Sequence, residues 1–145
     1  MSTNDDRFSQ LRSPAEAFDP EPPSAPVPYV PTALGRSPLP EDSAERKRVP
    51  LVTGVLDYFP AALAAVATHS LESNEKHNPG EPMHWARGKS MDHPDCILRH
   101  LVDARAALDP RYHLTALAWR ALALLQEELE GHGAPLAPAA TEGIR

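Results

Sequence analysis

The sequence has a single cysteine, Cys96, so it forms no intramolecular disulfide. It has no apolar run of about 18 residues, the length that a membrane-spanning helix needs. Its first ten residues, MSTNDDRFSQ, lack the basic segment followed by an apolar one that marks a secretory signal. Together these absences predict a protein of the reducing cytoplasm with no membrane partner.

Basic residues are too few for a general nucleic-acid-binding surface. The chain has 14 Lys and Arg against 20 Asp and Glu, a net charge of −6 at pH 7. Proteins that bind nucleic acid through its phosphates present a basic surface. We therefore expect no nucleic-acid partner.

Proline, in contrast, is abundant, with 17 residues, many of them near the N-terminus. Residues 1–48 have few large apolar side chains, so they cannot bury enough surface to offset the entropy lost on ordering. We predict an extended or disordered arm there, a helical domain over 49–131 and a flexible tail over 132–145. The segment PVPYVP, at 26–31, is a candidate polyproline II ligand; the alternatives are a solvated arm or one that wraps a neighbouring subunit.

Apolar periodicity predicts an all-α domain, a small helical bundle. Three helices are expected, over 61–75, 96–108 and 112–130. Pro60 suits the first turn of the first helix, and Asp92 or Asp95 can cap the second. Only the apolar segment 51–59 has a strand-like composition.

The three expected helices differ in how their apolar residues are distributed. In the first, Leu63, Val66 and Ser70 share one face, and a stripe of small residues, beginning with Ala61 and Ala65, leads toward Glu72 on the other. The second presents a core stripe made of Ile97, Leu101, Ala104 and Leu108. The third is apolar almost all the way round. A domain this small cannot bury such a helix alone, which predicts a homo-oligomer, a dimer or a tetramer.

Five of the seven histidines lie between Asn74 and His113, interleaved with carboxylates. Within this stretch His100 and Asp103 are three residues apart and share a helix face, as Glu72 and Glu75 do on the preceding helix. Two facing helices would present these four side chains to one cation, and oxygen-rich ligands favour Mg²⁺ or Mn²⁺. The alternatives are solvated glutamates and a half-buried His100 paired with Asp103.

A phosphorylated substrate would need further polar and cationic contacts. The candidates for binding it are His77, Asn78, His84, Trp85, Arg87, Lys89, Arg99, His113 and Arg120. Arg120 lies on an otherwise apolar face, where it must have either a phosphate or a carboxylate partner such as Asp103 or Glu127. Trp85 could stack on a base or pack in a core or an interface.

Two common sites are excluded, and a third is not expected. The GKS segment lacks the earlier glycine and the strand of a P-loop. An HD-type phosphohydrolase needs a His-Asp doublet, and this chain has only the reverse order, Asp92-His93. A structural zinc site is not expected from one cysteine and irregularly spaced histidines.

The motifs HNPG, HWARGKS, DHPDC and RHL occur in this order, between GVLDYFPAALAAVA and AWRALALLQEELE. In these motifs residues 46–130 resemble the phage and prophage family of dATP/dGTP diphosphohydrolase domain proteins, which is similar to the MazG-like all-α NTP pyrophosphatases. The resemblance implies a helical, oligomeric, Mg²⁺-dependent enzyme of the host cytoplasm that converts a purine dNTP into dNMP and pyrophosphate. Its catalytic residues here would be Glu75, His100 and Asp103.

Two other functions fit the same residues. The chain could bind a nucleotide without hydrolysing it, as a phage sponge for a defence signal would. It could also be an interaction protein that docks a partner through its proline-rich arm while the histidine-rich stretch only packs.

Overall fold

The computed structural model describes residues 36–89 and 91–140, and this part of the chain is all-α, without a strand. The elements are α1 (Ser43–Lys47), the π-helical turn η1 (Val52–Leu56), α2 (Pro60–His77), the 3-10 turn η2 (Arg87–Lys89), α3 (His93–Ala106) and α4 (Arg111–Gly131). The expected all-α class is confirmed. The three expected helices are α2, α3 and α4, each with ends within three residues of the expected ones.

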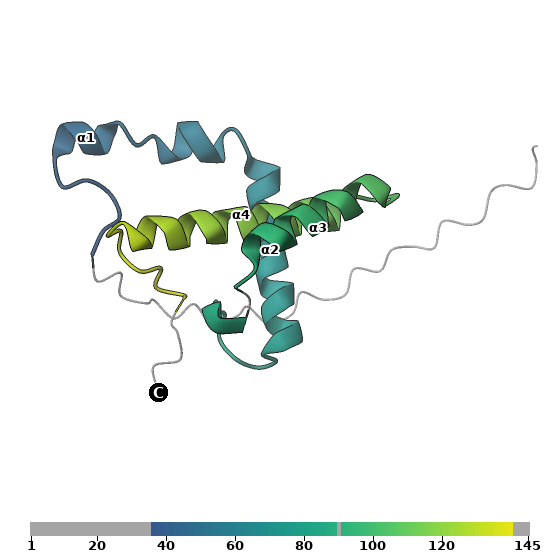
Figure 1. Cartoon of the computed structure of the whole chain (residues 1–145). Helices are drawn as coiled ribbons and strands as arrows, with labels where there is room; N and C mark the ends of the chain where they lie inside the picture. The colour runs from purple at the N-terminus through teal and green to yellow at the C-terminus, as the bar shows by residue number, and fades with distance from the viewer. Residues whose placement is uncertain (1–35, 90, 141–145) are drawn as a thin grey trace, which may run out of the picture.

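Helix α4 is the element on which both α2 and α3 pack (Figure 1). Helix α3 lies alongside it, joined by the short connection 107–110, and α2 crosses it at a steep angle. No Cα atoms of α2 and α3 approach within 8 Å of each other. The expectation that α2 and α3 face each other directly is therefore wrong within one subunit, because α4 packs against both.

Proline and glycine set several helix limits as expected. Pro60 and Pro94 occupy first turns, where the missing N–H costs nothing. Gly80 and Gly133 have φ values of 82° and 94°, which favour glycine and end the helical path after α2 and α4. Asp92 is the N-cap of α3 but makes no capping bond, since its carboxylate accepts from Arg99 and Cys96 instead.

The described chain before α2, residues 36–59, is mostly exposed. Helix α1, inside the expected arm, is capped by the Asp42 side chain, which accepts from the amides of Ala44 and Glu45. Segment 51–59 forms η1, whereas its composition was strand-like. The remainder of the expected arm, residues 1–35, lies outside the described part of the chain. No single described helix has the length and apolar content to cross a membrane, although the bent pair 43–56 and 60–77 meets these criteria jointly.

Few side chains are buried in the single chain. Within residues 36–89 and 91–140 the buried apolar residues are alanines, Ala116 and Ala123 in α4 and Ala140 beyond it. The α3 face toward α4 contains His93, Ile97, His100 and Ala104. Small and polar residues on this face let the two helices approach closely.

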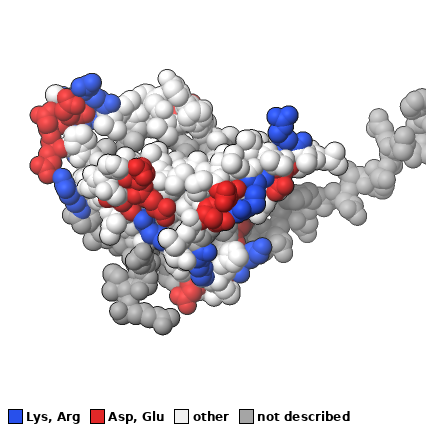
Figure 2. Space-filling view, viewed as in Figure 1, with Lys and Arg blue, Asp and Glu red and all other residues white. Residues whose placement is uncertain are grey.

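The expected core stripe of α3 is therefore only partly right. Leu101 is 44% exposed and Leu108 fully exposed, because the contacting face is rotated toward His93 and His100. The small-residue stripe of α2 is also exposed, together with Glu72 and Glu75. Leucines of α4, Leu122 and Leu125 among them, are exposed too. On the face drawn in Figure 2, small mixed groups of acidic and basic side chains are separated by broad uncharged surface.

Candidate functional site

A largely buried ion pair fixes the loop between α2 and α3. Both terminal nitrogens of Arg87 donate to the Glu130 carboxylate near the end of α4, with Nη2 to Oε1 at 2.8 Å. The two side chains are only 13% and 5% exposed. Glu130 Oε1 also accepts from Gln126 Nε2 and from the Ala137 amide. The Arg87 guanidinium and these donors lower the pKa of Glu130 from 4.5 to about 2.

An aromatic cluster lies beside this ion pair. The Trp85 ring packs edge-on against Trp119 at 5.7 Å between centroids, and against His93 at 6.3 Å. Arg87 covers Trp85 at 4.3 Å. Trp119 Nε1 donates to Ser70 Oγ at 2.9 Å, a bond that ties α4 to α2. The segment HWARGKS thus forms part of the packing of the domain.

His93 is the most buried residue of this cluster, at 2% exposure. Its Nδ1 lies 3.4 Å from Arg120 Nη1, and its Nε2 lies 3.6 Å from Glu127 Oε1. The sequence analysis considered His93 only as part of Asp92-His93, the reverse of the His-Asp order that an HD-type phosphohydrolase needs. The signal that could have found it is its place at the first turn of α3, one residue before Pro94 and on the face that continues to Ile97.

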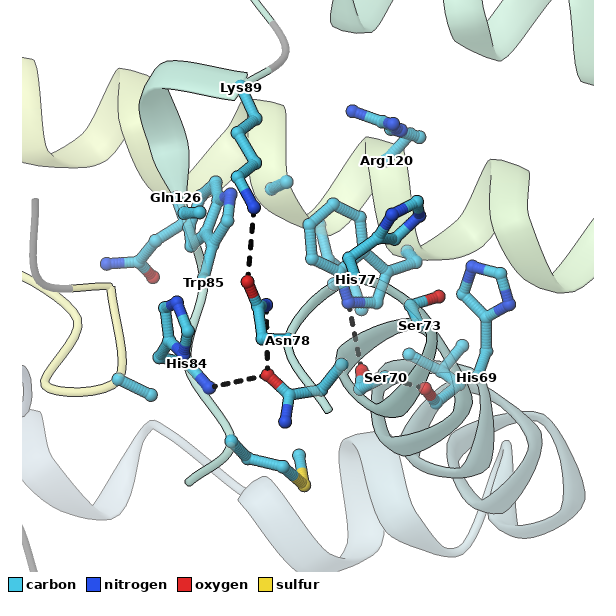
Figure 3. A pocket seen from close by; sticks show the side chains of 18 of the residues that line it. His69, Ser70, Ser73, His77, Asn78, His84, Trp85, Lys89, Arg120 and Gln126 are labelled. Carbon is cyan, nitrogen blue, oxygen red and sulfur yellow. Dashed lines mark hydrogen bonds between the residues drawn. The ribbon is translucent and has the colours of Figure 1, made fainter. Parts of the chain in front are cut away.

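A cavity of about 920 Å³ opens between α2, α4 and the loop 83–89 (Figure 3). Its polar lining comes from His69, Ser70, Ser73, Asn74, His77, Asn78, His84, Lys89, Arg120 and Gln126. Its apolar lining includes Met83, Trp85, Leu125 and Leu129. Among the described residues that line it there is no carboxylate.

Buried Asn74 organises the loop side of this cavity. Its Nδ2 donates to the Glu81 carbonyl at 3.0 Å, and its Oδ1 accepts from the His84 amide at 3.4 Å. Asn78 Nδ2 reaches the same oxygen, while Asn78 Oδ1 accepts from Lys89 Nζ at 3.1 Å. These bonds hold His84 and Lys89 on one side of the cavity, opposite His69 and Arg120 (Figure 3). Sequence reasoning missed Asn74, whose polar side chain is buried only because the loop folds over it.

The end of the chain also packs against this loop. The Trp85 amide donates to the Ala139 carbonyl at 2.7 Å, and Ala140 is buried. Residues 134–140 were expected to belong to a flexible tail, but the Glu130 carboxylate and the Trp85 amide bond to this segment, and Ala139 lines the cavity. Residues 141–145 lie outside the described part.

The structure brings six of the nine expected substrate-binding residues to this cavity. They are His77, Asn78, His84, Trp85, Lys89 and Arg120. The other three, Arg87, Arg99 and His113, lie elsewhere. Arg87 is paired with Glu130, and Arg99 donates to Asp92 at 2.5 Å on the exposed side of α3.

His113 instead joins His100 and Asp103 where α3 meets the start of α4. The Nδ1 atoms of the two histidines are 3.3 Å apart, and Asp103 Oδ2 lies 3.9 Å from His113 Nδ1. Burial lowers the pKa of His100, and the neighbouring His113 and Arg120 lower it further. Glu72 and Glu75, the other expected metal ligands, are exposed on α2 and do not belong to this cluster.

His69 connects the cluster to the cavity, and sequence reasoning missed it because it lies before the histidine-rich stretch. Its ring is 5.7 Å from that of Tyr112, which in turn lies 6.2 Å from His100. Burial lowers the pKa of His69, Glu72 raises it and Arg120 lowers it. Arg120 also lowers the pKa of His100, so its charge acts both on His69 in the cavity and on His100 in the histidine cluster.

The magnesium ion implied by the family resemblance fits these residues poorly within one chain. Mg²⁺ prefers carboxylate, phosphate and water oxygens, whereas the cluster offers two imidazole nitrogens and one carboxylate.

Comparison of the chain with protein-family models, with curated proteins and with solved structures gives no match in any of the three.

Proposed function

We propose that this chain binds a purine nucleoside triphosphate in the cavity between α2 and α4. The observation that carries the proposal is the lining of that cavity, where Lys89, Arg120 and three histidines converge without a carboxylate. Such a lining favours an anion, because positive side chains stabilise phosphate charge and no carboxylate is among the described residues that line the cavity.

The shape of the cavity also supports a nucleotide. Its volume of about 920 Å³ falls within the usual range of small-ligand sites. Its apolar wall, with Met83, Leu125 and Leu129, suits a base, while Lys89 and Arg120 suit the phosphates. Trp85 also lines the cavity. Because Arg87 covers its ring and the aromatic cluster holds it rigid, a base in the cavity would contact a fixed surface.

Calorimetry tests this proposal directly. Titration of dGTP or dATP into the protein should give saturable binding, and Lys89→Ala and Arg120→Gln should each weaken it by about tenfold, since each removes one charge-assisted contact. Lys47→Ala, on the exposed helix α1, is the matched control and should bind as the parent does. A parent that binds no dNTP, or a control that loses as much as Lys89→Ala, would refute the proposal.

The second candidate is hydrolysis of the bound nucleotide to dNMP and pyrophosphate. It is supported by the proximity of His100 and Asp103, two of the three expected catalytic residues, and by the charge of Arg120, which acts on His100 as well as lining the cavity. The third, Glu75, lies outside that group. Of the expected catalytic residues, this candidate therefore rests on His100 and Asp103.

Product analysis separates an enzyme from a nucleotide sponge. Incubation with dGTP and Mg²⁺ or Mn²⁺ should yield dGMP and pyrophosphate, and His100→Ala should abolish the yield without abolishing dGTP binding. Recovery of intact dGTP from a protein that binds it would instead support capture without turnover. The partner-docking alternative depends on the proline-rich arm, most of which lies outside the described residues.

We also propose that the chain is a cytoplasmic homo-oligomer. Apolar side chains on the outer face of α3, Leu98, Leu101 and Val102, are exposed by 60%, 44% and 66%. Together they form an exposed apolar surface of the kind that often marks a protein–protein contact. A second copy of the chain would cover it.

A further inference from the structure

The geometry points to a binding site for a divalent first-row transition-metal ion, made by His100, Asp103 and His113. This site differs from the oxygen-rich one expected from sequence, since it replaces both glutamates of α2 with an imidazole of α4. It requires neither the nucleotide nor the cavity, so it stands or falls independently of the proposed function.

The distance between the two imidazoles is the first argument. Two nitrogens that each lie about 2.05 Å from one ion at a tetrahedral angle are roughly 3.3 Å apart. The Nδ1 atoms of His100 and His113 are 3.3 Å apart. The two nitrogens thus already have the separation that a shared ion would impose.

The third ligand lies within reach of the same point. Asp103 Oδ2 is 3.9 Å from His113 Nδ1, and the three ligand atoms all lie within 4.8 Å of one another. Asp103 is exposed, so a small side-chain rotation can bring its carboxylate to the ion without disturbing packing. Its negative charge would offset part of the charge of the ion.

The neighbouring residues hold the imidazoles in position. His100 and His113 are both partly buried, one on α3 and the other on α4. Tyr112 packs edge-on against both rings, at 6.2 and 5.3 Å between centroids. Because α3 packs along α4, the two histidines approach through the packing of helices, without depending on a loop.

The donor set selects the kind of ion. Imidazole nitrogens suit Zn²⁺, Co²⁺, Ni²⁺ or Cu²⁺, whereas Mg²⁺ prefers oxygen ligands. Three protein ligands leave at least one coordination position for water or another ligand, as in catalytic rather than structural zinc sites. We expect Zn²⁺ and Co²⁺ to bind and Mg²⁺ to bind far more weakly.

Cobalt gives a direct readout of this geometry. Tag-free, chelator-treated protein titrated with Co²⁺ in the absence of nucleotide should develop visible absorption that saturates at one ion per chain. Zn²⁺ should displace the Co²⁺ signal and Mg²⁺ should not. His100→Ala and His113→Ala should each weaken Co²⁺ binding by about tenfold or more, since each removes one nitrogen ligand.

His132→Ala is the matched control, because His132 is an exposed histidine beyond the other end of α4. It should bind Co²⁺ as the parent does. Circular dichroism of each metal-free variant checks that it is folded, and His113→Asn serves if His113→Ala is not. A parent without saturable Co²⁺ binding, or equal losses in His132→Ala and His113→Ala, would overturn the assignment. Loss of nucleotide binding alone would not affect it.

Discussion

Arg87 and Glu130, 43 residues apart in the sequence, form a two-point ion pair that is almost fully buried. The pair joins the loop after α2 to the last turn of α4, and Glu130 extends it to the segment beyond α4 through the Ala137 amide. An arginine that the sequence suggested for phosphate binding thus has a carboxylate partner within the fold. The phosphate role is better assigned to Lys89 and Arg120.

Removal of Arg87 should destabilise the domain strongly. Arg87→Ala leaves the Glu130 carboxylate buried without its main partner, and breaking such a pair costs about 3–5 kcal/mol of unfolding free energy. Urea denaturation followed by circular dichroism measures this loss. Arg111→Ala is the control, since it removes an ion pair with Asp109 that is mostly exposed, and such pairs contribute about 1 kcal/mol or less. Equal losses in the two variants would contradict the structural role of Arg87.

The same pair predicts how stability depends on acid. The pKa of Glu130 is about 2 in the folded chain and ordinarily 4.5, so the folded state favours the ionised carboxylate. Its contribution is complete above pH 4.5 and is lost as the pH falls toward 2. Melting temperatures measured over this range should fall less steeply for Glu130→Gln than for the parent. The exposed carboxyl group of Asp109 also has a pKa of about 2, so Asp109→Asn serves as the control that shows how much of the acid dependence comes from Asp109. Parallel curves for Glu130→Gln and the parent would contradict the assignment.

The bond from Trp119 to Ser70 should couple α4 to α2. Trp119→Phe removes the Nε1 donor, and Ser70→Ala removes the acceptor. If the bond contributes, the double variant should lose less unfolding free energy than the two single losses combined, by about 0.5–1.5 kcal/mol. Urea denaturation of the four proteins measures this difference. Additive losses would mean that the 2.9 Å contact contributes nothing to stability.

The outer face of α3 should mediate assembly. Native mass spectrometry of the parent should give a multiple of the 15.8 kDa chain mass. Leu98→Glu and Val102→Glu should shift the population toward monomer, because each puts a charge into the proposed apolar contact. Arg105→Ala changes a residue on the same helix that is already polar and should leave the mass unchanged. A parent that is monomeric at all concentrations would rule out this assembly.

Local signals in the sequence were sufficient for α2, α3 and α4, but not for α1 and η1. Pro60 and Pro94 mark first turns, and Gly80 and Gly133 follow the ends of α2 and α4, because the backbone conformations of these residues depend little on distant contacts. The histidine-rich stretch likewise pointed to residues that line the cavity, such as His84 and Lys89. Both residues lie in the loop between α2 and α3, which the proline and glycine residues of this stretch predict.

The partners of those residues could not be read from the sequence. Whether Arg87 meets a phosphate or Glu130, and whether His100 meets the glutamates of α2 or His113, depends on which helices touch. Periodicity gives the faces of a helix but not its neighbour, and on α3 two adjacent apolar stripes left the contacting face open.

The sequence by itself determined an all-α chain, the limits of its main helices and the loop that carries most of its polar chemistry. Only the tertiary structure decided that α4 contacts both α2 and α3, that His113 joins His100 and Asp103, and that Arg87 is paired with Glu130. The physical reason is that helix propensity and turn formation act within a few residues, whereas ion pairs and ligand clusters form between side chains that only packing brings together.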